Sequence, residues 1–295
     1  MNNYMRVIGC MRLKDWMYNA ESRLGHSLLP ENAYLNLVDD DNSNCTFPNI
    51  FDYVHPVGEI FNLEGGDQYV GALNSKGQFH GKGTYYAKDG SVYHGSWVSG
   101  VKEGSGIYWG NVNSLDAFCY IGEFKDDCYW GKGKYLVKNG MIYEGKFIRN
   151  RLVIGYVKYT DGSSYNGSIG ENGYNGLGTY IDTQGNYYKG NWRNGIKYGE
   201  GVEFLNGQGE IKGIWENGVL LSGTWKTDEG DIYIGTFKNY QYEGEGYYVW
   251  HTGERYNGMW KKGKMDGMGK MWEKSGHGYK GVWRNNSCVE ILERW

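Results

Sequence analysis

The sequence of 295 residues has little of what secreted, membrane-spanning or ordinary globular chains carry. Its three prolines all precede residue 57, so the rest of the chain lacks the residue that interrupts the hydrogen-bond ladder of a sheet. No apolar run is long enough to span a membrane, and Arg6, Arg12 and Lys14 interrupt the stretch that a signal peptide would keep apolar. We therefore expect a cytoplasmic protein, with association to a cytoskeleton or a membrane surface left open.

Residues that carry chemistry are also few or scattered. The five cysteines are odd in number and include no CxxC pair, which is typical of reduced intracellular thiols. The six histidines have no metal-ligand spacing, and no Walker sequence or catalytic elbow occurs. An acidic run begins at Asp39, but Asn44 and Ile50 occupy the positions where a calcium loop requires glycine and glutamate. The sequence predicts a non-enzyme without cofactor or metal, although surface carboxylates alone do not exclude a glycosidase.

Glycine and aromatic residues are abundant, with 49 Gly, 28 Tyr and 12 Trp. Their arrangement is clearest from residue 256 onward, where Tyr256, Gly258 and Trp260 follow one another at a spacing of two. In an extended strand these three positions lie on one face. A polar turn follows, and Gly267 and Gly269 repeat the spacing, which predicts the second strand of a hairpin.

The same pattern occurs ten times at intervals of 22 to 27 residues. In each unit a glycine stands two residues after the start and a large apolar residue stands four after it, as in the unit with Tyr233, Gly235, Phe237, Gly244 and Gly246. The units begin at Tyr69, Tyr93, Tyr120, Tyr143, Tyr165, Tyr188, Ile211, Tyr233, Tyr256 and Tyr279. A fixed period of this length is the signature of a stacked repeat protein.

The unit, YxGxW or YxGxF followed by GxGxY and a closing glycine, resembles the MORN (membrane occupation and recognition nexus) repeat. The resemblance covers about three quarters of the chain. It implies an all-β fold, an elongated, twisted, single-layer antiparallel sheet of about ten stacked hairpins. It also implies a scaffold that binds a helical or extended segment of a partner protein, as such arrays do in cytoskeletal and ciliary assemblies. Self-association is a further possibility.

The ends of the chain depart from the repeat. Residues 1–68 are expected to cap the first edge of the sheet, with a helix near 11–24 and a degenerate half repeat at 57–68. The array then occupies residues 69–286. At the end, Ser287 with Glu290 three residues later is a capping-box pattern, which predicts a short helix over 287–295 that closes the second edge.

Three irregularities lie inside the array. Val153 and Leu221 replace the first glycine of the GxG pair, and in both units the preceding turn is one residue shorter. They predict a local bend or a changed surface, with ordinary drift in a tolerant repeat as an equally supported interpretation. An insertion of four residues between Gly106 and Tyr120 is expected to make the loop around residues 111–118 protrude.

Basic residues concentrate near the end of the array. A peripheral membrane module that binds acidic phospholipid is therefore the alternative function, at about 1 kcal/mol per basic residue near the surface. A solvated sheet edge protected by lysines is the plainer interpretation. Nucleic acid ranks lower because positive charge is not widespread, and carbohydrate binding by exposed rings is a third possibility. The candidate residues are Arg255, Lys261, Lys262, Lys264, Lys270, Lys274, Lys280 and Arg284.

Overall fold

The computed structural model describes residue 48 and residues 56–110, 113–114 and 116–295. The chain divides into two compact units, residues 1–152 and 153–295, and each is described by itself. The helix expected near 11–24 lies outside the described residues. Among the described residues, no helix has the length and apolarity needed to cross a membrane.

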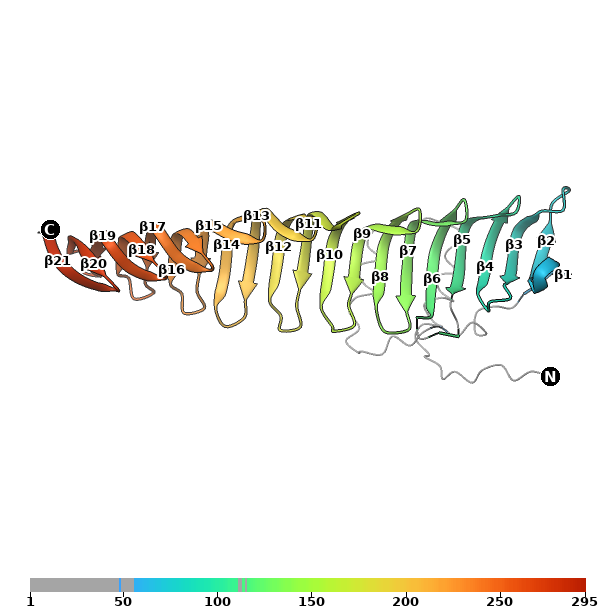
Figure 1. The fold of residues 1–295 in the computed structure, drawn as a ribbon, viewed down its shortest axis with the longest axis horizontal. Coiled ribbons are helices and arrows are strands. Elements are labelled where there is room, and N and C mark those ends of the chain that lie inside the picture. The colour runs from blue at the N-terminus through green and yellow to red at the C-terminus, as the bar shows by residue number, and fades with distance from the viewer. Residues whose placement is uncertain (1–47, 49–55, 111–112, 115) are drawn as a thin grey trace. The chain divides into compact units, whose positions relative to one another are not determined.

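The first unit is an antiparallel sheet in which each strand pairs with the next one in sequence (Figure 1). A 3₁₀ turn (Glu64–Gly66) separates the first two strands. The strands are β1 (Glu59–Asn62), β2 (Gln68–Leu73), β3 (Phe79–Tyr86), β4 (Val92–Val98), β5 (Val101–Gly110), β6 (Phe118–Lys125), β7 (Cys128–Val137) and β8 (Ile142–Ile148).

The second unit repeats this arrangement, again with sequential antiparallel pairing. Its strands are β9 (Arg151–Lys158), of which residues 153–158 belong to this unit, β10 (Ser164–Gly170), β11 (Gly173–Ile181), β12 (Tyr187–Arg193), β13 (Ile196–Leu205), β14 (Gly209–Glu216), β15 (Val219–Lys226), β16 (Ile232–Lys238), β17 (Gln241–Val249), β18 (Arg255–Lys261), β19 (Lys264–Trp272), β20 (Gly278–Arg284) and β21 (Ser287–Arg294). The predicted all-β repeat fold is thereby confirmed in both units.

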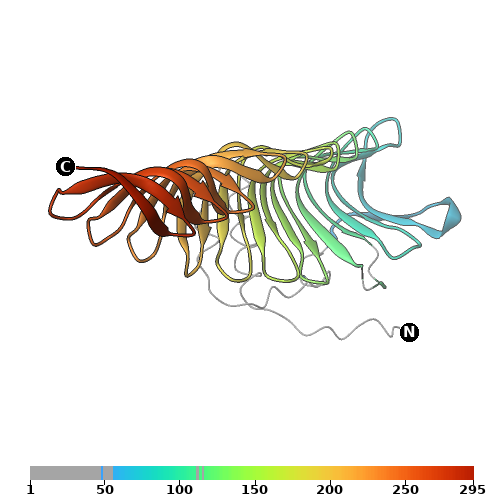
Figure 2. The ribbon, with the colours of Figure 1, turned by 60° about the vertical axis from the view of Figure 1, so that its left-hand side comes forward.

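Two kinds of turn connect the strands, one along each long edge of a unit (Figure 2). Along one edge lie two-residue turns in which both residues have positive φ, such as Ser99 and Gly100 at 51° and 87°. This geometry matches the twist of the flanking strands in a tight hairpin. Along the other edge lie longer loops closed by a glycine with positive φ, such as Gly90, whose N–H donates to the carbonyl of Ala87 at 2.9 Å.

The core consists of tyrosine rings that lie flat on glycine. A Cβ on Gly258 or Gly269 would lie 2.6 or 2.3 Å from the hydroxyl oxygen of Tyr256, which is completely buried. Both glycines belong to the hairpin of that tyrosine. The tyrosine hydroxyl donates to the carbonyl three residues onward in Tyr69, Tyr93, Tyr120, Tyr165, Tyr188, Tyr233 and Tyr256.

Tryptophan joins one hairpin to the next. The indole N–H of Trp260 donates to the carbonyl of Gly246 in the preceding hairpin at 3.2 Å. Its ring also meets the ring of Tyr233 edge-on, with centroids 5.6 Å apart and an interplanar angle of 85°. Trp97 and Trp192 make the same hydrogen bond to the hairpins before them. Neighbouring hairpins therefore share both hydrogen bonds and ring contacts, so each stabilises the next.

The last segment of the chain corrects one prediction. Residues 287–295 do not form a capping helix, because Ser287–Arg294 is strand β21, paired with β20 from Arg284↔Ser287 to Tyr279↔Arg294. The backbone of Trp295 also exchanges two hydrogen bonds of 3.1 Å with Gly278. The unpaired edge of β20 offers a ladder of donors and acceptors, which outweighs the weak local preference of the capping-box pattern.

Candidate functional site

A shallow groove of about 840 Å³ crosses strands β10 to β15 of the second unit. Its floor is a row of glycines aligned across the sheet in the register Gly178↔Gly190↔Gly201↔Gly213↔Gly223. On the opposite face tyrosine rings cover the first part of this row, since a Cβ on Gly190 or Gly201 would meet the hydroxyl of Tyr188, whereas Leu220 and Trp215 cover Gly213. The groove therefore has bare main chain at its base.

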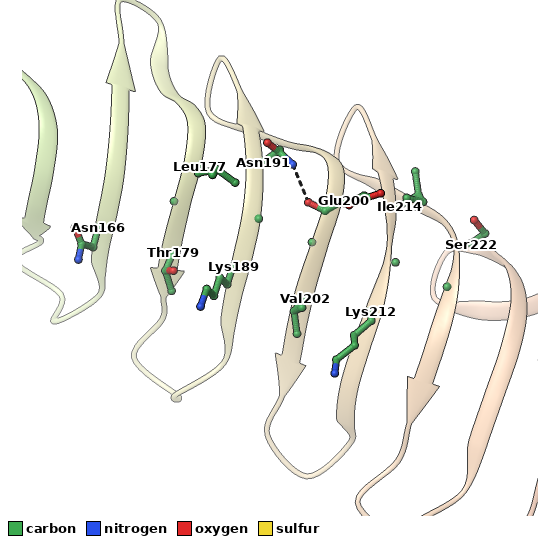
Figure 3. A pocket seen from close by; sticks show the side chains of 15 residues that line it. Asn166, Leu177, Thr179, Lys189, Asn191, Glu200, Val202, Lys212, Ile214 and Ser222 are labelled. Atoms are coloured by element: carbon green, nitrogen blue, oxygen red, sulfur yellow. Dashed lines mark hydrogen bonds between the residues drawn. The ribbon is translucent and has the colours of Figure 1, made fainter.

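Two rows of side chains form the walls, because residues next to the glycines point away from the tyrosine face (Figure 3). We call them the lysine wall and the opposite wall. The lysine wall is Asn166, Thr179, Lys189, Val202 and Lys212, and the opposite wall is Leu177, Asn191, Glu200, Ile214 and Ser222. The Asn191 side-chain amide donates to the Glu200 carbonyl at 3.1 Å and fixes this part of the opposite wall.

The two walls differ in charge. The lysine wall holds two cations and no carboxylate, whereas the opposite wall holds Glu200 and two exposed apolar side chains, Leu177 at 69% and Ile214 at 40%. Lys212 also forms an ion pair of 3.3 Å with Glu210, two residues away on the same strand. The groove is thus positive along one side and apolar with one negative charge along the other.

The sequence singled out Leu221, and the structure shows a changed bulge there. In an ordinary hairpin such as β16–β17, two extra residues on the second strand, Gly244 and Glu245, stand between the paired positions, and Gly244 has a φ of 71°. In β14–β15 the pairs Trp215↔Leu220 and Ile214↔Ser222 leave one extra residue, Leu221. The turns are equally long, because Glu216↔Val219 and Lys238↔Gln241 each close a two-residue turn. The missing residue is therefore lost from the bulge and not, as the sequence suggested, from the turn, and the one-residue bulge needs no positive φ.

The bulge also explains why the first glycine of a pair can be replaced. That glycine lies in the bulge and the rings rest on the second glycine, so Leu221 displaces no ring. Instead, Leu220 approaches Gly213, where an added Cβ would lie 2.7 Å from its Cδ1. Val153 lies in β9 and, like Leu221, has no positive φ.

Most of the predicted basic residues share the face that bears the groove. Strand alternation places Arg255, Lys261, Lys264, Lys270, Lys280 and Arg284 on this face, while Lys262 and Lys274 lie in turns. Strand β21 adds carboxylates that the predicted helix concealed, because Glu293 stands opposite Lys280 and Glu290 stands opposite Val282. The structure therefore gathers the cations and also places negative charge beside them.

The buried carboxylates of the second unit have structural partners. Glu203 takes the place of a repeat tyrosine. Its carboxylate forms an ion pair with the Lys197 ammonium and accepts a hydrogen bond of 2.6 Å from the Tyr240 hydroxyl. Burial would raise the pKa of Asp231, but hydrogen bonds from Tyr248 at 2.6 Å and from His251 lower it overall. In the part of the chain that the structure describes, no group of three or more His, Cys, Asp or Glu side chains could hold a metal ion.

Stacked hairpins with rings on one face and a groove over aligned glycines on the other define a β-hairpin repeat protein. The MORN repeat family model matches residues 75–92, 93–113, 120–142, 188–209, 233–255 and 256–277. The chain is a MORN-repeat protein. Hairpins β10–β11 and β14–β15 lie outside the matched segments yet keep the antiparallel pairing and aligned glycines of the others.

Other comparisons are remote. Over 41 residues, 14% of this chain, the sequence is 44% identical to "Inactive protein tyrosine kinase pTKL" of Plasmodium falciparum (isolate 3D7), and the match spans 3% of that protein. The wild-type TCP10 domain of Danio rerio CPAP is 10% identical, with 80% of this chain and 99% of that chain covered at a TM-score of 0.34. The CPAP G-box domain is also 10% identical, with 77% of this chain and 100% of that chain covered at a TM-score of 0.31. TM-scores this low carry no argument about fold or function.

Proposed function

We propose that the protein is a non-enzymatic scaffold whose groove in the second unit binds a segment of another protein. The row of exposed main chain between the two walls supports this proposal most directly. Strand alternation directs this row toward the tyrosine face, so a partner can approach the backbone from the groove. A continuous groove across β10 to β15 suits a long segment better than a small molecule. A cytoplasmic location, and the cytoskeletal or ciliary setting that the MORN resemblance implies, are part of the proposal.

Site-specific photo-cross-linking tests it. A photo-reactive residue at Thr179, in the lysine wall, should cross-link a protein partner in the native cell. A matched residue at Thr252, in an exposed loop of the same unit, should cross-link much less. If neither position, nor a third one in the opposite wall at Ser222, captures a protein, the scaffold proposal fails.

Binding to acidic phospholipid is the second candidate, favoured by the six basic side chains that share one face of β18 to β20. Charge reversal at Lys261, Lys262 and Lys264 should abolish sedimentation with anionic vesicles at low salt, and added salt should weaken it. Replacing Glu290 and Glu293 by Lys should strengthen vesicle binding, because these carboxylates adjoin the basic side chains. Sedimentation that ignores both sets of changes would remove this candidate.

A further inference from the structure

Resting on the proposed scaffold function, we infer that the partner segment in the groove is an amphipathic α-helix lying across the strands. Its apolar ridge would rest on the glycine floor. Acidic residues seven positions apart would face the lysine wall, and the flank facing the opposite wall would carry no acidic residue.

The spacing of the strands favours a helix over an extended segment. Neighbouring strands lie about 4.8 Å apart. In an α-helix the positions i, i+3 and i+7 lie on one face at rises of about 4.5 and 10.5 Å, so they reach successive strands almost in step. An extended segment repeats its side chains every 6.8 Å or so on one face and loses register after a single strand. The floor from β10 to β15 spans about 24 Å, the length of about 16 helical residues.

The lysine wall sets the position of the acidic residues. Lys189, Val202 and Lys212 are directly opposed across β12, β13 and β14, so the two lysines are two strand spacings apart, about 10 Å. Helical positions i and i+7 have about the same separation. Both ammonium groups belong to exposed side chains, and Val202 between them leaves an apolar contact for the intervening turn.

The opposite wall determines which flank of the helix faces which wall. Glu200 would repel an acidic residue there, while Leu177 and Ile214 offer exposed apolar surface. A helix with acidic residues on both flanks, or rotated about its axis by half a turn, would place a carboxylate beside Glu200. The groove therefore selects for charge arrangement as well as for apolar content.

Selection from a display library of random peptides of about 16 residues against the full chain tests this inference. The enriched peptides should show apolar residues at helical spacing and acidic residues seven apart. They should bind roughly tenfold more weakly to a K189E/K212E variant at low salt, because two attractions become repulsions. A matched K270E/K280E variant changes the same row on the same face outside the groove and should change binding less than twofold.

Circular dichroism of each variant checks that the sheet is retained. Enriched peptides with alternating apolar residues, or with affinity unchanged by K189E/K212E, would overturn the inference. If no peptide is enriched but photo-cross-linking still captures a partner at the groove, the inference fails and the scaffold proposal stands. If the selection enriches no peptide and photo-cross-linking captures no protein, both the inference and the scaffold proposal fail.

Discussion

Replacing Gly269 by alanine tests the contact on which the repeat depends. The added Cβ would lie 2.3 Å from the hydroxyl oxygen and 2.4 Å from two ring carbons of Tyr256, so the ring must leave its site. Gly269 does not have a positive φ, so its backbone accepts alanine without strain. In a strand without such a clash, alanine in place of glycine would stabilise by about 0.5–1 kcal/mol. The sign of the effect therefore distinguishes ring contact from backbone preference.

The expected cost follows from the burial of the ring. Tyr256 is fully buried, and a ring of about 200 Å² at about 25 cal/mol per Å² contributes up to about 5 kcal/mol. Overpacking that shifts the ring without expelling it costs about 1–3 kcal/mol. We therefore expect Gly269→Ala to lower the free energy of unfolding of the second unit by about 3–5 kcal/mol.

A double-mutant cycle gives the control. Once Tyr256→Ala has removed the ring, Gly269→Ala should cost almost nothing, which corresponds to a coupling energy of about 3–5 kcal/mol. Urea unfolding followed by tryptophan fluorescence measures the total, and hydrogen exchange of β18 and β19 shows whether the loss is local, as expected for a repeat array. A cost below about 1 kcal/mol, or additive single effects, would refute the proposed packing of ring on glycine.

Three further predictions concern other contacts. Trp260→Phe should lower the free energy of unfolding by about 0.5–1.5 kcal/mol beyond the loss of buried ring area, because the indole N–H donates to the Gly246 carbonyl. Trp283→Phe should cost less in the same chemical unfolding assay, because the buried N–H of Trp283 has no acceptor. Equal costs would contradict the role of this hydrogen bond. Burial raises the pKa of Tyr165, Tyr188 and Tyr256 to about 12, so the folded state retains their protons more firmly than the unfolded chain. Stability should be intact below about pH 10 and fall as pH rises toward 12, with the tyrosinate absorbance of these three residues appearing together with unfolding. Ionisation of these three residues near pH 10 in a folded chain, measured as the difference from their Phe variants, would count against it. Deletion of residues 287–295 should expose Trp283 and the edge of β20, increasing hydrogen exchange in β20 and promoting aggregation, while a chain that stays monomeric with unchanged exchange would show that β21 is dispensable.

The sequence predicted the repeat unit and its strands well because period-two spacing is a local property. Tyr256, Gly258 and Trp260 lie on one face, as their spacing requires. It did not predict which glycines lie beneath which ring, because this depends on the register between strands and on the extra residues of each bulge. Gly267 is a bulge glycine with a φ of 115°, and Gly269 lies under the ring, yet the two are alike in sequence.

The groove and the last strand were harder to predict for a different reason. Lys189 and Lys212 stand in different repeats, and only the pairing of three strands brings them into one wall. At the C-terminus, a four-residue pattern at Ser287 and Glu290 favours a helix, but pairing with β20 is a contact that no local pattern contains. The candidate basic residues were identified, while the carboxylates of β21 that adjoin them were missed.

The backward hydrogen bond of tryptophan has a consequence for how the chain is synthesised. The ring of Trp260 packs edge-on against the ring of Tyr233, and Trp260 follows Tyr233 by 27 residues in the chain. A hairpin that has just left the ribosome therefore still has an incomplete tyrosine site, and the next hairpin completes it. Maturation of the sheet must then lag translation by one unit, so the newest tyrosine ring is the one available to a chaperone.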